Sequence, residues 1–326
     1  MRRVLISLVV CCSSISAFAA ETGANFSDFS FNGGLKYAHL KNRMRYASQY
    51  NGYQNISGFT GATLTWTNMM SKGAELSANL THNPTRIFAN FSFITGWSSE
   101  QSGNMRDIDF ITSSGVTIGD TISGAKMSHN YSMHVDFGRS FFVGSTTLSP
   151  SLGYYYADAK MDAYGATALP VGNNTLYNNF GISPGFSIGN AIKITTEQAI
   201  VHAPRLSIGL SQPLTDNLTF NIEPAYMPFA NMTFNDWHHV NADKVQDGAP
   251  NLIAKKMGWG YSLDADMSYK FSQKIDILIG LKYAKFSMGE ANVLNRMVAG
   301  SNIQTNGAKS LDFETLGLLV GAKLKF

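Results

Sequence analysis

Apolar and polar residues alternate with a period of two along almost the whole chain, and no other feature constrains the fold as strongly. This pattern predicts strands with one face in an apolar environment and the other in a polar one. It recurs over 29–37, 87–97, 131–137, 148–156, 206–210, 218–226, 261–269, 275–283 and 316–326. The sequence therefore predicts an all-β protein, and nothing in it indicates a second domain.

A soluble sandwich would show the same alternation, but three features favour a transmembrane antiparallel β-barrel. The alternating stretches are about 9–13 residues long, enough for tilted strands to cross a bilayer. Charged residues at alternate positions, such as Asp264 and Lys282, would face a polar lumen. Aromatic residues stand at the ends of the stretches, as in interfacial girdles: Tyr37, Trp66, Trp97, Tyr156, Tyr226, Trp259, Tyr269 and Tyr283. We expect about ten strands, and an even number.

The composition agrees with a membrane location. Only 14% of the residues are charged, whereas a soluble domain carries about 25%. The formal net charge of +3 argues against a nucleic-acid-binding protein. The alternation continues to a terminal aromatic residue, Phe326, which is typical of bacterial outer-membrane barrels.

The first 19 residues predict a signal peptide. Arg2 and Arg3 precede an apolar core over 4–15, and Ala17-Phe18-Ala19 fits the small-x-small cleavage rule. The apolar core is short for a membrane anchor, and a lipoprotein is less favoured because Val10 before Cys11 is large. We expect residues 20–326 to form one barrel in the outer membrane of a Gram-negative bacterium. Because the 2 cysteines, Cys11 and Cys12, would be removed, Cys nucleophiles and disulfide scaffolds are excluded.

Short and long connections alternate in the predicted layout, as in barrels with short periplasmic turns and long extracellular loops. Turn-forming residues occur over 68–72, 81–85, 215–217 and 271–273. The long connections are expected over 40–55, 100–129, 162–200, 232–256 and 287–309.

Two acidic clusters fall at the start of predicted long loops. Asp107 and Asp109 are two residues apart, so an extended backbone places both carboxylates on one face. Like charges at that spacing raise the pKa of one of them. Asp236 and His238 have the same spacing, and a carboxylate beside an imidazole orients it as a base. Either pair alone is ordinarily a solvated turn; their shared location favours a functional site.

The segment Gly103-Asn104-Met105-x-Asp107-x-Asp109, which follows Trp97, resembles the signature of the omptins. These are ten-stranded outer-membrane endoproteases with the active site in the extracellular mouth of the barrel. Asn235-Asp236-x-His238 is similar to the second conserved segment of that family, in the matching place along the chain. The resemblance extends to the terminal strand and so covers nearly the whole mature chain.

The resemblance implies an endopeptidase that uses an activated water. His238 would be the general base, oriented by Asp236. Asp107 and Asp109 would hold the water and stabilise or protonate the tetrahedral intermediate. No acyl-enzyme would form, and no cofactor is implied. Zinc is not predicted, since the adjacent His238 and His239 would point to opposite faces and no third ligand is evident.

Two positions depart from the family pattern. Omptins that cut beside basic residues carry acids in the substrate pocket, and the best-matching positions here hold Arg43 and Phe234. We therefore assign both to substrate binding and do not expect cleavage between paired basic residues. A neutral, apolar or acidic side chain at the cleavage site fits better.

A third segment, Tyr156-x-Asp158-x-Lys160, resembles a family element that contacts lipopolysaccharide. Lys255 or Lys256 would add positive charge, and the basic residue expected before Ala203-Pro204 is at best His202. Lipopolysaccharide is thus an expected partner, and activity could require it.

Three alternatives stay open. One is a non-catalytic adhesin or surface-binding barrel of omptin type, because the substrate pocket is altered. Another is a lipid hydrolase with a Ser–His pair, although the chain has no Gly-x-Ser-x-Gly turn. A passive porin is less favoured, because side chains fill the lumen of a barrel of about ten strands.

Overall fold

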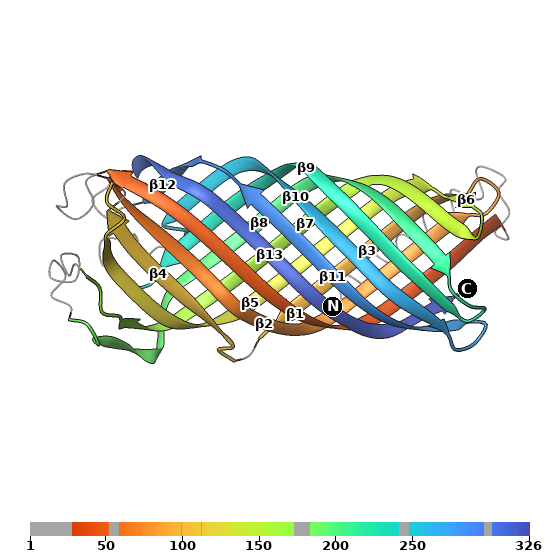
Figure 1. The fold of residues 1–326 in the computed structure, drawn as a ribbon, viewed down its shortest axis with the longest axis horizontal. Helices are drawn as coiled ribbons and strands as arrows, with labels where there is room; N and C mark the ends of the chain where they lie inside the picture. The colour runs from red at the N-terminus through yellow and green to blue at the C-terminus, as the bar shows by residue number, and fades with distance from the viewer. Residues whose placement is uncertain are drawn as a thin grey trace.

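The chain forms one antiparallel sheet that closes on itself (Figure 1). The computed structural model describes residues 28–51, 59–98, 100–111, 113–172, 183–240, 248–296 and 302–326; the predicted signal peptide, 1–19, lies outside them. The strands are β1 (Phe29–Asn51), β2 (Phe59–His82), β3 (Ile87–Trp97), β4 (Gly103–Ile111), β5 (Thr117–Arg139), β6 (Phe141–Val143), β7 (Thr146–Ala168), β8 (Ser187–Pro213), β9 (Leu218–His238), β10 (Leu252–Lys270), β11 (Ile275–Met288), β12 (Ala291–Arg296) and β13 (Asn302–Lys325).

Ten of these strands make the ring. Each pairs with the next in the order β1-β2-β3-β5-β7-β8-β9-β10-β11-β13, and β13 pairs with β1. The other three prolong ring strands: β4 continues β3 between β2 and β5, β12 continues β11 between β10 and β13, and β6 continues β5 beside β7. The predicted ten-stranded transmembrane barrel is confirmed. In the part of the chain that the structure describes, no helix is long and apolar enough to span a membrane.

The two ends of the barrel differ. At one end, the turn end, neighbouring strands are joined by short turns, among them 83–86, 214–217 and 271–274, close to three of the predicted turns. The fourth prediction, 68–72, is wrong: Asn68 lies within β2 at a bulge opposite β1 and has a φ of 55°. Turns and bulges both use left-handed backbone, so the residue signal does not separate them. We call the opposite end the loop end.

The strands run much further toward the loop end than predicted. β8 has 27 residues and β2 has 24, whereas crossing a bilayer takes about 9–11. Consequently, much of the predicted loops 40–55 and 100–129 is strand, in β1, β4 and β5. Beyond the bilayer the outer face no longer has to be apolar, so the alternation fades although the pairing continues.

The outer face carries an apolar belt. Aliphatic side chains such as Leu35, Leu152 and Ile279 are more than half exposed on it, which in water would be a large unfavourable patch and in a bilayer faces lipid. Trp97 and Trp259 border the belt on the loop-end side. The register places Asp236 opposite Leu252, beyond Trp259, so this part of β9 lies outside the membrane-spanning segments.

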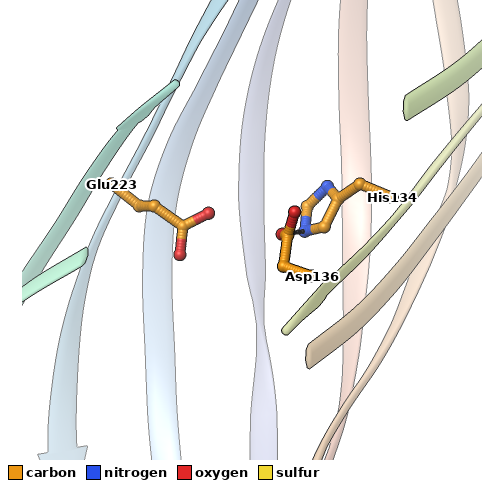
Figure 2. Close-up of side chains that lie close together, drawn as sticks. All are labelled: His134, Asp136 and Glu223. Atoms are coloured by element: carbon orange, nitrogen blue, oxygen red, sulfur yellow. Dashed lines mark ion pairs between the residues drawn. The ribbon is translucent and has the colours of Figure 1, made fainter. Parts of the chain in front are cut away.

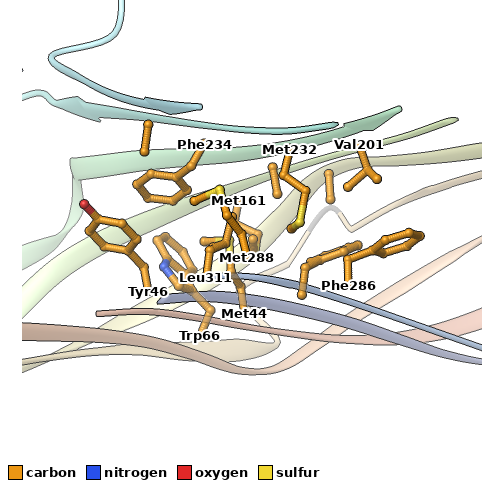
Figure 3. Packing of buried hydrophobic residues seen from close by; sticks show 14 of the residues in the cluster. Met44, Tyr46, Trp66, Met161, Val201, Met232, Phe234, Phe286, Met288 and Leu311 are labelled. Atoms are coloured by element: carbon orange, nitrogen blue, oxygen red, sulfur yellow. The ribbon is translucent and has the colours of Figure 1, made fainter. Parts of the chain in front are cut away.

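The lumen has two layers. The turn-end half is polar, as predicted, with Lys282 bridging Glu75 and Asp264 at 3.3 Å each and a cavity of about 440 Å³ beside them. Buried apolar side chains fill the next layer (Figure 3), including Met44, Trp66, Met161, Met232, Phe286, Met288 and Leu311. The order of the layers can be followed along β9. Residues 221–223 line the cavity, residues 227–234 contribute to the apolar layer, and Asp236 and His238 follow toward the loop end. The candidate catalytic residues thus lie above an apolar floor.

Candidate active site

Asp107 and Asp109 lie on the inward face of β4. The same face carries the buried Met105, while Arg106 points outward and makes two hydrogen bonds to Asp120 of β5, at 2.9 and 2.6 Å. This fork-shaped ion pair fixes β4 against β5. The Asp pair is therefore part of a regular strand rather than of a loop, and the predicted side-by-side orientation follows from the strand period.

Asp236 and His238 lie on the inward face of β9, also within the strand. Oδ2 of Asp236 is 2.9 Å from Nε2 of His238. Oδ1 of Asp236 accepts a hydrogen bond from Thr195 at 3.0 Å, and the backbone N–H of His238 donates to Oδ1 of Asn251 at 2.7 Å. These contacts fix the carboxylate and the backbone that carries the imidazole.

The two pairs act on each other electrostatically across the mouth of the barrel. Burial raises the pKa of Asp107 to about 6, with His238 opposing the shift and Asp236 adding to it. Burial and the neighbouring Asp107 raise the pKa of Asp109 well above its usual range. Among the described residues, Oδ1 of Asp107 is buried and has no hydrogen-bond partner. The structure thus brings together all four residues to which the sequence analysis assigned a catalytic role.

A fifth acidic residue, Glu197, belongs to the same cluster, and the sequence analysis missed it. Glu197 on β8 pairs directly with Asp236 on β9, and its Oε2 accepts a hydrogen bond from Nε1 of Trp66 at 2.6 Å. Burial, Asp236 and Asp107 raise its pKa well above the usual range. The sequence contains a signal for it, since Glu197 shares the phase of the inward-facing Ala199 and Val201. The prediction of a loop over 162–200 hides this signal.

The two predicted substrate-binding residues do not lie together. Phe234 is fully buried, and its ring stacks on that of Tyr46 with 4.4 Å between centroids. Arg43 instead points outward: it is exposed between the buried Asn42 and Met44 and pairs with Glu314 of β13. Contrary to the prediction from the sequence, Arg43 does not line the pocket, because it is out of phase with the inward face of β1.

Tyr156, Asp158 and Lys160 lie on the outer face of β7. Oδ1 of Asp158 is 3.0 Å from Nε2 of His129 and accepts a hydrogen bond from Gln198 at 2.7 Å. The ammonium of Lys160 lies 4.8 Å from the ring centroid of Trp237.

The other residues that the sequence predicts to bind lipopolysaccharide lie in three different surroundings. Nδ1 of His202 is 2.6 Å from the hydroxyl of Tyr154. Lys255 is exposed on β10. The pairing of β10 with β9, of β9 with β8 and of β8 with β7 places it at the same height along the barrel as Asp158. Lys256 bonds the backbone of Glu290 instead. Tyr156, Asp158, Lys160 and Lys255 therefore border one outer face.

One group among the described residues has metal-ligand spacing, and it lies in the polar half of the lumen. Figure 2 shows His134, Asp136 and Glu223, whose ligand atoms lie within 4.8 Å of one another. The buried guanidinium of Arg205 bonds both Asp136 and Glu223, the latter at 2.6 Å. Because Arg205 already forms ion pairs with both carboxylates, we interpret the group as an ion-pair network in the polar half of the lumen, separate from the candidate active site.

Comparison with known proteins gives a likeness in fold. No protein-family model and no curated protein matches the chain. Among solved structures, the outer membrane protease OmpT from Escherichia coli is similar over 93% of this chain and 98% of its own, with 14% identity and a TM-score of 0.71.

Two other barrels are less similar. Neisserial surface protein A matches 91% of this chain and 97% of its own, at 9% identity and a TM-score of 0.29. The translocator domain of the autotransporter NalP from Neisseria meningitidis matches 98% and 97%, at 14% identity and a TM-score of 0.32. The likeness to OmpT, with its TM-score of 0.71, establishes for this chain the fold of a membrane β-barrel of that kind.

Proposed function

We propose that this chain is an omptin-like endopeptidase of the Gram-negative outer membrane, with its site facing outside. The observation that carries the proposal is the meeting of Asp107 with the Asp236–His238 pair across the loop end of the barrel. The likeness in fold to an outer membrane protease supports the expectation of peptidase activity. Because one fold hosts many functions, the proposal is argued from the residues of the site.

The geometry suits attack by water without a covalent intermediate. The contact between Asp236 and Nε2 of His238 keeps a proton on that nitrogen, so Nδ1 takes the proton from water as hydroxide attacks the scissile carbonyl. Asp109, whose pKa is raised by burial and by Asp107, supplies a protonated carboxyl that donates to the developing oxyanion. The imidazolium then returns its proton to the leaving amine.

The inward-facing side chains suit a neutral or apolar residue at the cleavage site. Phe234 stands two residues before Asp236, on the same face, and stacks on Tyr46. A basic substrate side chain directed toward these buried rings would lose its hydration, and neither ring supplies a carboxylate in exchange. We therefore propose that paired basic residues are poor substrates.

Lipopolysaccharide is the partner that suits the outer face. Lys160 and Lys255 carry positive charge beyond the apolar belt, where phosphate groups of an outer leaflet would lie. Binding there would bridge β7 and β10, and β8, which lies between them, carries Glu197 behind the site. We propose that the lipid raises activity without taking part in the chemistry.

The test is hydrolysis of a diverse peptide library by refolded protein, with and without lipopolysaccharide. His238→Ala should abolish cleavage, whereas His239→Ala should not, because His239 bonds Thr196 on the outer face. Circular dichroism would verify the barrel in each variant. Cleavage that survives in His238→Ala would refute the proposal.

A second function has one observation in its favour. The Phe234–Tyr46 stack lies where omptins that cut beside basic residues carry an acid, and this change suits a surface-binding barrel that has lost peptidase activity. Under this alternative, the folded parent would cleave no peptide in either condition.

A further inference from the structure

One hydrogen bond joins the two walls of the candidate site across the lumen. Trp66 of β2 donates from Nε1 to Oε2 of Glu197 on β8 at 2.6 Å, although 131 residues separate them in the chain. On the shorter way round the ring, β3, β5 and β7 lie between β2 and β8. Both side chains are fully buried. The bond therefore spans the barrel instead of following its wall.

Each end of this bond lies beside one half of the site. Trp66 pairs with Met105 on β4, two residues before Asp107 on the same inward face. Glu197 pairs with Asp236 on β9. Directly paired residues have their Cβ atoms about 4.5–5.5 Å apart. The bond thus runs beneath the site from the wall with the Asp pair to the wall with the Asp–His pair.

The other contacts across this layer are less directional. Tyr46 stacks on Phe234, Tyr155 packs against Phe286, and most of the other side chains of the cluster are aliphatic or methionine. These apolar contacts resist separation of the walls but do not fix the distance between them. A hydrogen bond has a narrow range of length and angle. The bond between Trp66 and Glu197 is therefore the contact best suited to set the width of the site.

The surroundings of Glu197 favour a neutral acceptor. The charged and titratable groups that act on it are Asp236 and Asp107, from β9 and β4, and together with burial they raise its pKa. Among the described residues, its Oε1 is buried without a hydrogen-bond partner, as suits a protonated oxygen better than an ionised one. A glutamine at this position would keep both the shape and the acceptor.

We propose that Glu197 is a positioning residue, whose hydrogen bond to Trp66 sets the separation between Asp107 and the Asp236–His238 pair. Its effect on catalysis rests on the proposed function, whereas its effect on geometry does not. Reacting groups must approach to about 3–3.5 Å, and an error near 1 Å costs about 100-fold in rate. A cross-lumen bond that fixes the two walls thus has direct consequences for turnover.

The geometric test measures the distance between the walls. From residue 20 on the chain contains no cysteine, so Asn104→Cys on β4 and Lys255→Cys on β10, both exposed, accept a pair of spin labels. The parent and Glu197→Gln should give the same narrow distance distribution. Glu197→Leu and Trp66→Phe should each give a shifted or broader one. Heat-dependent gel mobility would verify that each variant forms a folded barrel. If both variants are folded and their distance distributions are unchanged, the proposal is overturned.

The kinetic test separates positioning from charge. Glu197→Leu and Trp66→Phe should each lower kcat about 100-fold with little change in KM, and the double variant should be no worse than either. Glu197→Gln should stay within about threefold of the parent, since it retains the acceptor. Equal losses in Glu197→Gln and Glu197→Leu would contradict the proposal. A parent without peptidase activity would refute the proposed function and leave the spin-label result to decide this one.

Discussion

Asp236 lies behind His238, with 2% of its side chain exposed against 30% of the imidazole. The carboxylate is withdrawn from solvent while the ring reaches the open end of the barrel. This arrangement suits a base that meets substrate and an orienting group that does not. It also makes the role of each residue separable by substitution.

Asp236→Asn should lower kcat by about 100- to 10,000-fold. The amide would present an N–H to Nε2 of His238 and favour the wrong tautomer, while the shape of the side chain is retained. Thr195→Val removes the hydrogen bonds from its hydroxyl to Oδ1 of Asp236 and to the backbone oxygen of Trp237, and should cost about tenfold or less. Steady-state kinetics on one cleaved peptide measures both, and a fully active Asp236→Asn would exclude the assigned role.

Stability should depend on pH through Asp107. Its pKa is raised from 3.8 to about 6 in the folded chain, so the native state binds more protons than the unfolded state between these values. The contribution of Asp107 to the free energy of unfolding is fully present below about pH 4 and is lost as the pH rises through about 6. Asp107→Asn should therefore raise the free energy of unfolding at pH 7.5 by about 1–3 kcal/mol, with no gain at pH 3.5. Urea unfolding at the two pH values tests this, and equal effects at both would contradict it.

Substrate preference should respond to Phe234 and not to Arg43. Phe234→Leu removes the stack on Tyr46 and should change the ratio of kcat/KM between large and small apolar side chains by about tenfold. Arg43→Ala should leave this ratio unchanged, because Arg43 is exposed on the outer face. A changed preference in Arg43→Ala would show that the outer face reaches the substrate.

Arg205 should stabilise the barrel through its ion pairs with Asp136 and Glu223, and the stability should not depend on a bound metal. Arg205→Met leaves Asp136 and Glu223 without their buried partner and should cost about 3–5 kcal/mol. Arg45→Met, at an exposed position of β1, should cost less than about 0.5 kcal/mol. Thermal unfolding followed by gel mobility compares the two. Zinc or a chelator should leave the midpoint of the parent unchanged, and a rise with zinc would contradict the ion-pair interpretation.

The membrane-spanning part of the barrel followed from the sequence because lipid and lumen impose opposite requirements on successive residues. The extensions of the strands toward the loop end could not be predicted in this way, because both of their faces contact water or protein and the alternation weakens there. Asp107 and Asp236 were found despite being assigned to loops, because a spacing of two residues holds in any extended segment.

The errors at single residues have local causes. Tyr37, which is outward-facing, shares its phase with Arg43, so the orientation of Arg43 could have been predicted by extending the first strand. The bond between Trp66 and Glu197 could not, because it depends on how a ring of ten strands closes and staggers. Contacts across the lumen leave no periodic signal in the chain.

The central claim is that Asp107 and His238, on opposite walls, act on the same water. A double-mutant cycle on kcat/KM, with parent, Asp107→Asn, His238→Ala and the double variant, tests it most directly. The account predicts that each single variant loses at least about 100-fold and that the double variant is no worse than the poorer single one. Additive losses, or a single variant that keeps the activity of the parent, would contradict the account.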